Sequence, residues 1–179
     1  MLVNGGREIT PSLIDRVQDR NGVTVYRHDR RPCEGCLVAA WAGGLPPEPP
    51  DVRRQIANPA KVYQVVSMLR GVVTRGTGRR IAKIGKPLAG KTGTSNDSVD
   101  TWFIGFAPDL AVGVFVGFDK PRSLGPFDSG SNVAAPVFKT FMEGALADRP
   151  AVPFRRPSGV RLVRINPRTG RLADANDRG

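Results

Sequence analysis

The sequence contains one histidine and two cysteines, so it offers few ligands for a zinc ion. Cys33 and Cys36 form a single C-x-x-C pair and His28 is the only histidine, whereas a structural zinc site needs four ligands. A thioredoxin-like redox site would need a βαβ pattern around the pair, which is not visible. We therefore expect either a local disulfide in an oxidising compartment or two free thiols in a reducing one.

Long apolar runs and a signal peptide are also missing. The longest apolar stretch, residues 111–118, has the length of a strand, whereas a transmembrane helix needs about 18 residues. Residues 1–6 lack the cationic and apolar regions of a signal peptide. We expect a globular chain, 40% hydrophobic, with no export or membrane signal of its own.

Acidic residues are scarce, with 16 Asp and Glu against 27 Lys and Arg and a net charge of +11. Residues 149–179 carry eight arginines against Asp174 and Asp177, which gives this tail a net charge of +6. Basic residues are spread along the chain, and the tail has prolines and almost no aromatic residues, so nucleic-acid binding is not expected. Such a tail would serve beside any anionic polymer or membrane surface.

The first part of the chain predicts turns and one hairpin. Asn4, Gly5 and Gly6 are typical of the end of a helix. Asn21-Gly22 joins two β-prone runs, and this dipeptide favours a tight hairpin turn with positive φ at both residues. Residues 28–57 are interrupted by Pro, Gly and Cys, so we expect a loop or insertion there.

Two amphipathic helices are predicted. The first starts at the cap Asn58 with Pro59 at its first position and stops near Gly76. The second is capped near Ser131 or Asn132. Their expected buried faces are Val62, Val65, Val66, Leu69, Val72 and Val73 in the first, and Ala134, Val137, Phe138, Phe141, Met142 and Ala145 in the second.

Residues 102–106 and 111–118 predict two strands, and the four residues between them favour an antiparallel pair. Their continuous apolar character indicates a sheet covered on both faces. Gly105, Gly113 and Gly117 indicate close approach by a packed helix or by backbone.

Residues 85–92, G-K-P-L-A-G-K-T, match the phosphate-binding pattern G-x-x-x-x-G-K-[ST]. A P-loop must run directly into a helix, but the residues that follow are poor helix formers and a strand comes next. The preceding residues 79–84 are too charged for a buried parallel strand. Nucleotide binding therefore stays a minor alternative.

The same residues have a second interpretation as a strand with the sequence K-T-G-T. Lys91 would supply positive potential, Thr92 and Thr94 would hold a carboxylate through their hydroxyls, and Gly93 would let a ligand backbone approach. The three residues K-T-G occur too often by chance to show, by themselves, that this strand binds a ligand.

A longer pattern favours the strand interpretation. L-A-G-K-T-G-T-S-N-D at 88–97, D-T-W-F-I-G-F-A-P-D at 100–109 and V-G-F-D at 116–119 closely resemble the bifunctional class A penicillin-binding proteins, the 1A type best. The resemblance covers about residues 1–146, with V-N-G-G at 3–6 and R-G-T-G at 75–78 upstream. It implies an α+β fold of the serine β-lactamase and D,D-peptidase type, in which helices pack on an antiparallel sheet, here incomplete.

The resemblance implies a D,D-transpeptidase that cross-links peptidoglycan stem peptides and is acylated by β-lactams, with no cofactor or metal. Catalysis in this family uses S-x-x-K, S-x-N and K-T-G. None of the eight serines has a lysine three positions later or opens S-x-N; Ser67, with Arg70 at that position, comes closest. We therefore expect a chain that carries the third motif alone and is inactive by itself.

In the family the missing motifs lie N-terminal to this region, so we expect residues 1–148 to be the C-terminal portion of a transpeptidase domain and 149–179 a basic tail. The full-length enzyme would act on the periplasmic face of the inner membrane through a missing N-terminal anchor. The resemblance assigns catalysis to Lys91, substrate or penicillin binding to Thr92, Gly93 and Thr94, and half of the oxyanion hole to the N–H of Thr94. The alternative is a non-catalytic module that binds peptidoglycan or a divisome partner through its tail.

Overall fold

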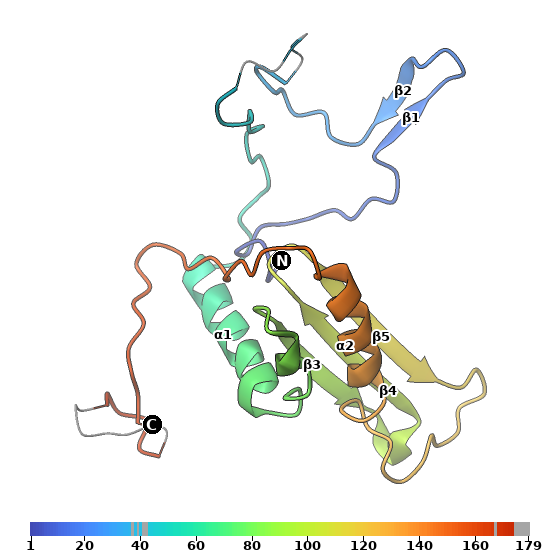
Figure 1. Ribbon diagram of the computed structural model, residues 1–179, viewed down its shortest axis with the longest axis vertical. Helices are drawn as coiled ribbons and strands as arrows, with labels where there is room; N and C mark the ends of the chain where they lie inside the picture. The colour runs from blue at the N-terminus through green and yellow to red at the C-terminus, as the bar shows by residue number, and fades with distance from the viewer. Residues whose placement is uncertain (37, 39, 41–42, 167, 174–179) are drawn as a thin grey trace. The chain divides into compact units, whose positions relative to one another are not determined.

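The computed structural model describes residues 1–36, 38, 40, 43–166 and 168–173 (Figure 1). The chain forms two compact units, each described here by itself. The smaller unit comprises Met1 and Gly6–Ile56, and the larger one Leu2–Gly5 and Ala57–Gly179.

The smaller unit contains the expected hairpin, with strands β1 (Arg16–Gln18) and β2 (Thr24–Arg27) paired antiparallel. The expected turn geometry is wrong, because only Gly22, at φ 81°, has positive φ and Asn21 does not. Asp19 explains the difference: its carboxylate accepts the N–H groups of Asn21 and Val23, and its carbonyl accepts that of Gly22. These bonds hold a wider turn, and a bulge at Gln18 absorbs the extra residue.

The rest of the smaller unit has little regular structure or core. Its described residues after β2 form no helix or strand, and only an isolated bridge joins Gln55 to Arg7. Cys33 and Cys36 are joined in a disulfide, and no group of three potential metal ligands occurs in the described part of the chain. Because Gly6 is the only buried residue described here, local turns and ion pairs rather than apolar burial hold this unit.

The first residues have the geometry of a helix end, as expected. The N–H of Gly6 donates to the carbonyl of Met1 at 3.0 Å, and Gly5 has φ 70°. A bond across five residues with a left-handed glycine is the usual C-terminal stop of a helix.

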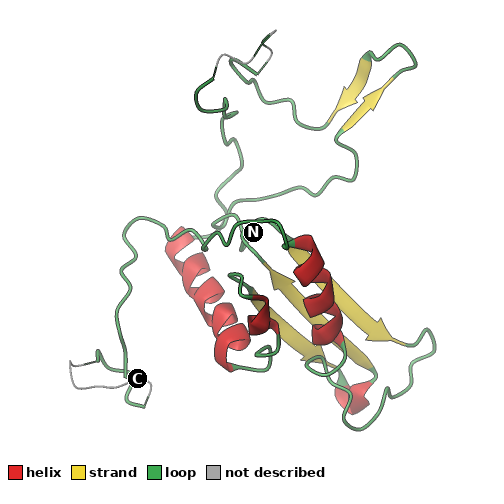
Figure 2. Ribbon diagram, in the orientation of Figure 1, coloured by secondary structure: helices red, strands yellow, loops and turns green. Residues whose placement is uncertain are grey.

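The larger unit is built on a three-stranded antiparallel sheet in the order β3 (Ala89–Thr94), β4 (Asp100–Phe106) and β5 (Ala111–Gly117) (Figure 2). The predicted antiparallel pair is therefore confirmed. Helix α2 (Ala134–Ala145) packs on one face, where the rings of Phe138 and Phe103 lie 4.7 Å apart. Gly105 permits this contact, since a Cβ there would lie 2.7 Å from the Phe138 ring, whereas Gly113 has no such close neighbour.

Helix α1 (Pro59–Arg75) packs against β3 and confirms the predicted start. The side chain of Asn58 accepts the N–H groups of Ala60 and Lys61, which would otherwise lack partners. Gly76 ends the helix as expected. A second small core lies here and comprises Val66, Ala89 and Phe106, with Leu2, Val3, Leu69 and Phe154 packed against it.

Parts of the predicted helix faces are wrong. Val65 of α1 and Val137 and Phe141 of α2 are exposed, because each helix buries a narrower stripe than its apolar pattern suggests. The cap of α2 is Val133, not Ser131 or Asn132. The hydroxyls of Ser129 and Ser131 bond to each other at 2.8 Å, so neither caps the helix.

The second face of the sheet is covered only at one end, where Phe106 packs with Val66 and Ala89, and not along its whole length as expected. Phe103 of β4 is fully buried under α2 and Thr101 is also fully buried, whereas Trp102 and Ile104, which alternate with them, are 43% and 56% exposed. Phe115 on β5 is 50% exposed and its ring lies 4.8 Å from that of Trp102. Trp102, Ile104 and Phe115 thus have no covering layer within the described chain.

Candidate functional site

All four predicted site residues lie on β3, an edge strand that pairs only with β4 among the described residues. The backbone register defines which groups face the open edge. Ser95 donates its N–H to Asp100 at 3.0 Å, one step beyond the pair Thr94 and Thr101. Since hydrogen-bonded and non-bonded pairs alternate in antiparallel sheets, the N–H and C=O groups of Thr92 and Thr94 point away from β4, toward the open edge.

Lys91 lies along this edge. Its exposed side chain donates from Nζ to the carbonyl of Thr92 at 2.9 Å and to the Thr92 hydroxyl at 3.3 Å. The first bond uses one of the edge carbonyls that β4 leaves free. The structure therefore places a cation, a hydroxyl and outward N–H groups within one short stretch of open strand.

A further residue, Thr77, completes this group. Its hydroxyl lies 3.1 Å from that of Thr92. Gly76 and Gly78 on either side both donate their N–H groups to the carbonyl of Val72, so the chain turns back on α1 and presents Thr77 at the tip of the turn. We did not predict this role: the glycine on each side of the threonine indicates a turn but not its contact with Thr92.

Thr94 has a different partner from Thr92. Its hydroxyl accepts the N–H of Gly130 at 3.0 Å. Gly130 is buried against the sheet, where a Cβ would lie 2.5 Å from the carbonyl oxygen of Trp102 and 2.6 Å from that of Gly93. Gly130, in the segment before α2, thus packs directly on the backbone of β3 and β4 beside the site. No sequence pattern indicated this contact.

Gly93 lies on the opposite face of β3, next to the exposed apolar residues. A Cβ at this position would lie 3.2 Å from that of Trp102, with which Gly93 pairs. Lys91 pairs with Ile104 on the same face. A ligand backbone that approaches the edge at Gly93 therefore meets an apolar surface beside a cation.

The turn after β3 is strained and held in place. Asp97 and Ser98 have φ values of 56° and 53°, a left-handed pair that residues other than glycine rarely form. The carbonyl of Asp97 accepts the Ser123 hydroxyl at 2.6 Å, and that of Ser98 accepts the N–H of Leu124 at 3.0 Å. These bonds fix the end of β3 that carries Thr94.

The structure removes the basis of the nucleotide alternative. Gly85 follows the short 3-10 helix η1 (Ile81–Ile84) and adopts φ 72°, and the chain then enters β3. No helix begins at Lys91 or Thr92, so this segment does not present the helix N-terminus on which a P-loop depends.

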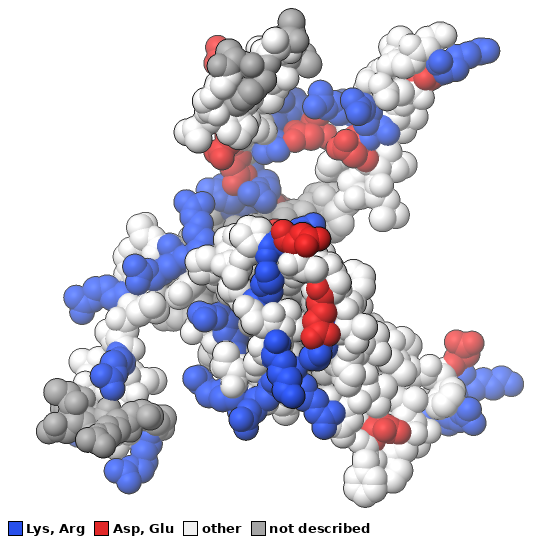
Figure 3. All heavy atoms as spheres, viewed as in Figure 1, with Lys and Arg blue, Asp and Glu red and all other residues white. Residues whose placement is uncertain are grey.

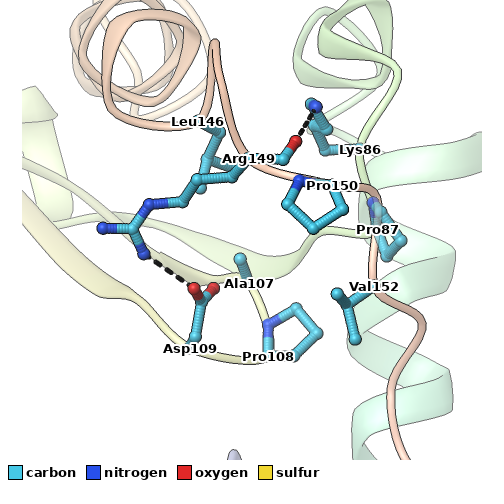
Figure 4. A pocket seen from close by; sticks show the side chains of 9 residues that line it. All are labelled: Lys86, Pro87, Ala107, Pro108, Asp109, Leu146, Arg149, Pro150 and Val152. Atoms are coloured by element: carbon cyan, nitrogen blue, oxygen red, sulfur yellow. Dashed lines mark hydrogen bonds and ion pairs between the residues drawn. The ribbon is translucent and has the colours of Figure 1, made fainter. Parts of the chain in front are cut away.

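A small pocket lies beyond the other end of β3 (Figure 4). Its volume is about 110 Å³, well below the several hundred Å³ typical of ligand pockets. Arg149 spans it, with an ion pair to Asp109 at 2.7 Å and a carbonyl that accepts a hydrogen bond from Lys86. We interpret this pocket as the place where the start of the tail is fastened to the sheet.

No helix in the described part of the chain combines the length and apolar character needed to cross a bilayer.

Comparison with known proteins agrees with the sequence resemblance. The family model for the penicillin binding protein transpeptidase domain matches residues 1–143. The chain is 40% identical over 174 residues to penicillin-binding protein 1A of Rickettsia conorii, covering 96% of this chain and 22% of the relative. It is 35% identical over 203 residues to penicillin-binding protein 1A of Pseudomonas aeruginosa, covering 97% and 25%. The chain thus spans about a quarter or less of the length of these relatives.

Solved structures agree on the fold. Penicillin-binding protein 1A from Haemophilus influenzae aligns with a TM-score of 0.78 and 24% identity, covering 99% of this chain and 29% of that one. The D,D-transpeptidase domain of a peptidoglycan glycosyltransferase from Eggerthella lenta aligns with a TM-score of 0.51 and 26% identity, covering 80% and 30%. The expected α+β fold and the resemblance to the 1A type are confirmed.

Proposed function

Because this chain belongs to the penicillin-binding protein transpeptidase family, we propose that the open edge of β3 is the substrate-binding strand of a peptidoglycan D,D-transpeptidase. The observation that carries the proposal is the open edge itself, where Lys91 Nζ, the Thr92 hydroxyl and the outward N–H of Thr94 lie within four residues. The ligand is the carboxylate end of a stem peptide, or the carboxylate of a β-lactam.

Each residue has a role that follows from its position. Lys91 attracts the carboxylate, and the hydroxyls of Thr92 and Thr94 each keep bonding capacity for it beyond their present partners. The outward N–H of Thr94 supplies half of the oxyanion hole, and Gly93 leaves room for the ligand backbone. Gly130 and the Ser123–Leu124 contacts keep this strand rigid, so the donors need no reorganisation during the reaction.

The nucleophile comes from another segment of polypeptide. No serine of this chain is followed by lysine three positions later, and without a nucleophile no acyl-enzyme forms. In a longer polypeptide that joins this chain to an S-x-x-K segment, Lys91→Ala should lower the rate of acylation by penicillin roughly 10²- to 10³-fold. The reaction belongs on the periplasmic face of the inner membrane.

Binding to the chain itself tests the proposal. A short peptide ending in D-alanyl-D-alanine is titrated into the isotope-labelled chain, and the amide signals of Thr92 and Thr94 are followed by NMR. We expect these signals to shift with the free carboxylate and not with the same peptide as a C-terminal amide. Lys91→Ala should abolish the shifts, and Lys61→Ala, an exposed lysine on α1, should not. Equal shifts with acid and amide would contradict the proposal.

A further inference from the structure

The chain between Asp51 and Asp97 contains no acidic residue. Positions 52–96 carry ten lysines and arginines, and all 16 acidic residues lie elsewhere. This segment forms α1, η1 and β3. The candidate site therefore lies in a stretch of sequence that carries positive charges and no acidic residue.

Cations gather at the C-terminal end of α1 and along η1, where Figure 3 shows Lys and Arg side chains grouped together. We name Arg75, Arg79, Arg80 and Lys83 the basic cluster. All four are exposed, and none forms an ion pair with a carboxylate of the described residues. Their charge therefore faces solvent without local compensation.

The basic cluster is fastened next to the open edge of β3. Arg75 and Arg79 each stand two residues from Thr77, whose hydroxyl lies 3.1 Å from that of Thr92. Ile81 at the start of η1 is fully buried, and Arg79 donates its N–H to the carbonyl of Gly76 at 3.2 Å. Two residues span at most about 7 Å, so the Cα atom of Arg79 lies no farther than that from the Cα atom of Thr77, whose hydroxyl contacts Thr92.

We infer that the basic cluster is a second subsite for the ligand of β3, and that it binds a side-chain carboxylate of an acidic peptide whose terminal carboxylate lies at Lys91 and Thr92. This inference rests on the proposed function. Guanidinium groups bind carboxylates through paired hydrogen bonds. An extended peptide advances about 3.3 Å per residue, so an acidic residue three positions before the C-terminus lies roughly 10 Å from the terminal carboxylate, a separation that the two-residue step from Thr77 to Arg79 and the long arginine side chain can bridge.

The test uses two peptides, acetyl-Ala-Glu-Ala-D-Ala-D-Ala and its counterpart with Gln in place of Glu, titrated into the full chain. One variant carries Arg79→Gln, Arg80→Gln and Lys83→Gln; Arg75 is retained because it lies in the last turn of α1. The matched control carries Arg155→Gln, Arg156→Gln and Arg161→Gln in the tail. Both variants lose three positive charges at exposed positions, and unchanged NMR spectra elsewhere verify their folds.

We expect the unmodified chain to bind the Glu peptide roughly fivefold more tightly than the Gln peptide at low salt, as for a few exposed ion pairs. The preference should vanish in the cluster variant, persist in the tail variant and disappear at about 1 M salt, where the screening length is roughly 3 Å. A preference that survives in the cluster variant, or that is lost equally in the tail variant, would overturn the inference. Equal binding of C-terminal acid and amide would instead overturn the proposed function.

Discussion

Gly130 lies so close to Trp102 that a Cβ on this glycine would be 2.5 Å from the Trp102 carbonyl oxygen. The same Cβ would be 2.6 Å from the carbonyl of Gly93, within the candidate site. Both neighbours are backbone atoms of the sheet and cannot rotate away. The absence of a side chain at Gly130 therefore allows its N–H to reach the hydroxyl of Thr94.

Gly130→Ala should accordingly lower the free energy of unfolding by about 2–4 kcal/mol, because the sheet and the segment before α2 must separate. Gly144→Ala is the control: Gly144 lies within α2 with nothing near its missing Cβ, and alanine there should stabilise the chain by about 0.5–1 kcal/mol. Urea unfolding of both variants measures the difference. Equal stability of the two variants would show that the close contact at Gly130 relaxes without cost.

Asp51 should stay ionised in acid. Hydrogen bonds from Arg53, with the charge of Arg7 nearby, hold the pKa of Asp51 well below its usual value near 4. The ionised form is favoured in the fold, so its stabilisation is complete above about pH 4 and is lost as the pH falls toward the lowered pKa.

NMR titration of the Asp51 carboxyl carbon checks this. We expect little protonation at about pH 3 in the unmodified chain and a rise of the pKa toward 4 in Arg53→Gln. Arg54→Gln, which removes the partner of Glu8 instead, should leave the titration of Asp51 unchanged. Titration of Asp51 near pH 4 in the unmodified chain would refute the prediction.

Local sequence signals predicted the elements well where one residue type determines the geometry. Asn58 and Pro59 located the start of α1, because an amide side chain and a missing N–H both suit a helix N-terminus. Asn21-Gly22 located a hairpin but not its turn type, since the carboxylate of Asp19 competed for the turn N–H groups. The K-T-G segment was correctly placed on a strand.

The supports of the site could not be predicted in this way. Thr77 meets Thr92 and Gly130 meets Thr94 through contacts 15 and 36 residues apart. Such contacts depend on how α1 and the segment before α2 pack on the sheet, which no local pattern encodes. Apolar periodicity likewise indicated that Val137 faces the core, although it is exposed. Periodicity identifies the apolar side of a helix, but it does not show how much of that side the rest of the protein covers.

A fluorescent penicillin should not label the purified chain covalently. Acylation needs an activated serine, and none of the eight serines has a lysine three positions later. Penicillin-binding protein 1A of Pseudomonas aeruginosa, a relative 35% identical over 203 residues, serves as the positive control on the same denaturing gel. A denaturation-resistant fluorescent band on this chain would show that it carries a nucleophile of another kind.

The isolated chain should associate with itself through the second face of the sheet. Trp102, Ile104 and Phe115 are each 43% to 56% exposed, and they lie on adjacent antiparallel strands, so they form one apolar surface. Exposed apolar surfaces of this kind favour association, and the open edge of β3 adds unpaired backbone groups beside it.

We expect the chain to bind a hydrophobic dye and to scatter light as an oligomer despite its net charge of +11. Ile104→Thr combined with Phe115→Thr should reduce both signals, because threonine retains β-propensity while removing apolar area. Val137→Thr combined with Phe141→Thr, at exposed positions of α2, removes similar apolar area from elsewhere and should change neither signal. A compact monomer with a sharp cooperative melt and no dye binding would mean that this face is stable in water without a partner, and that the chain needs no covering layer to fold.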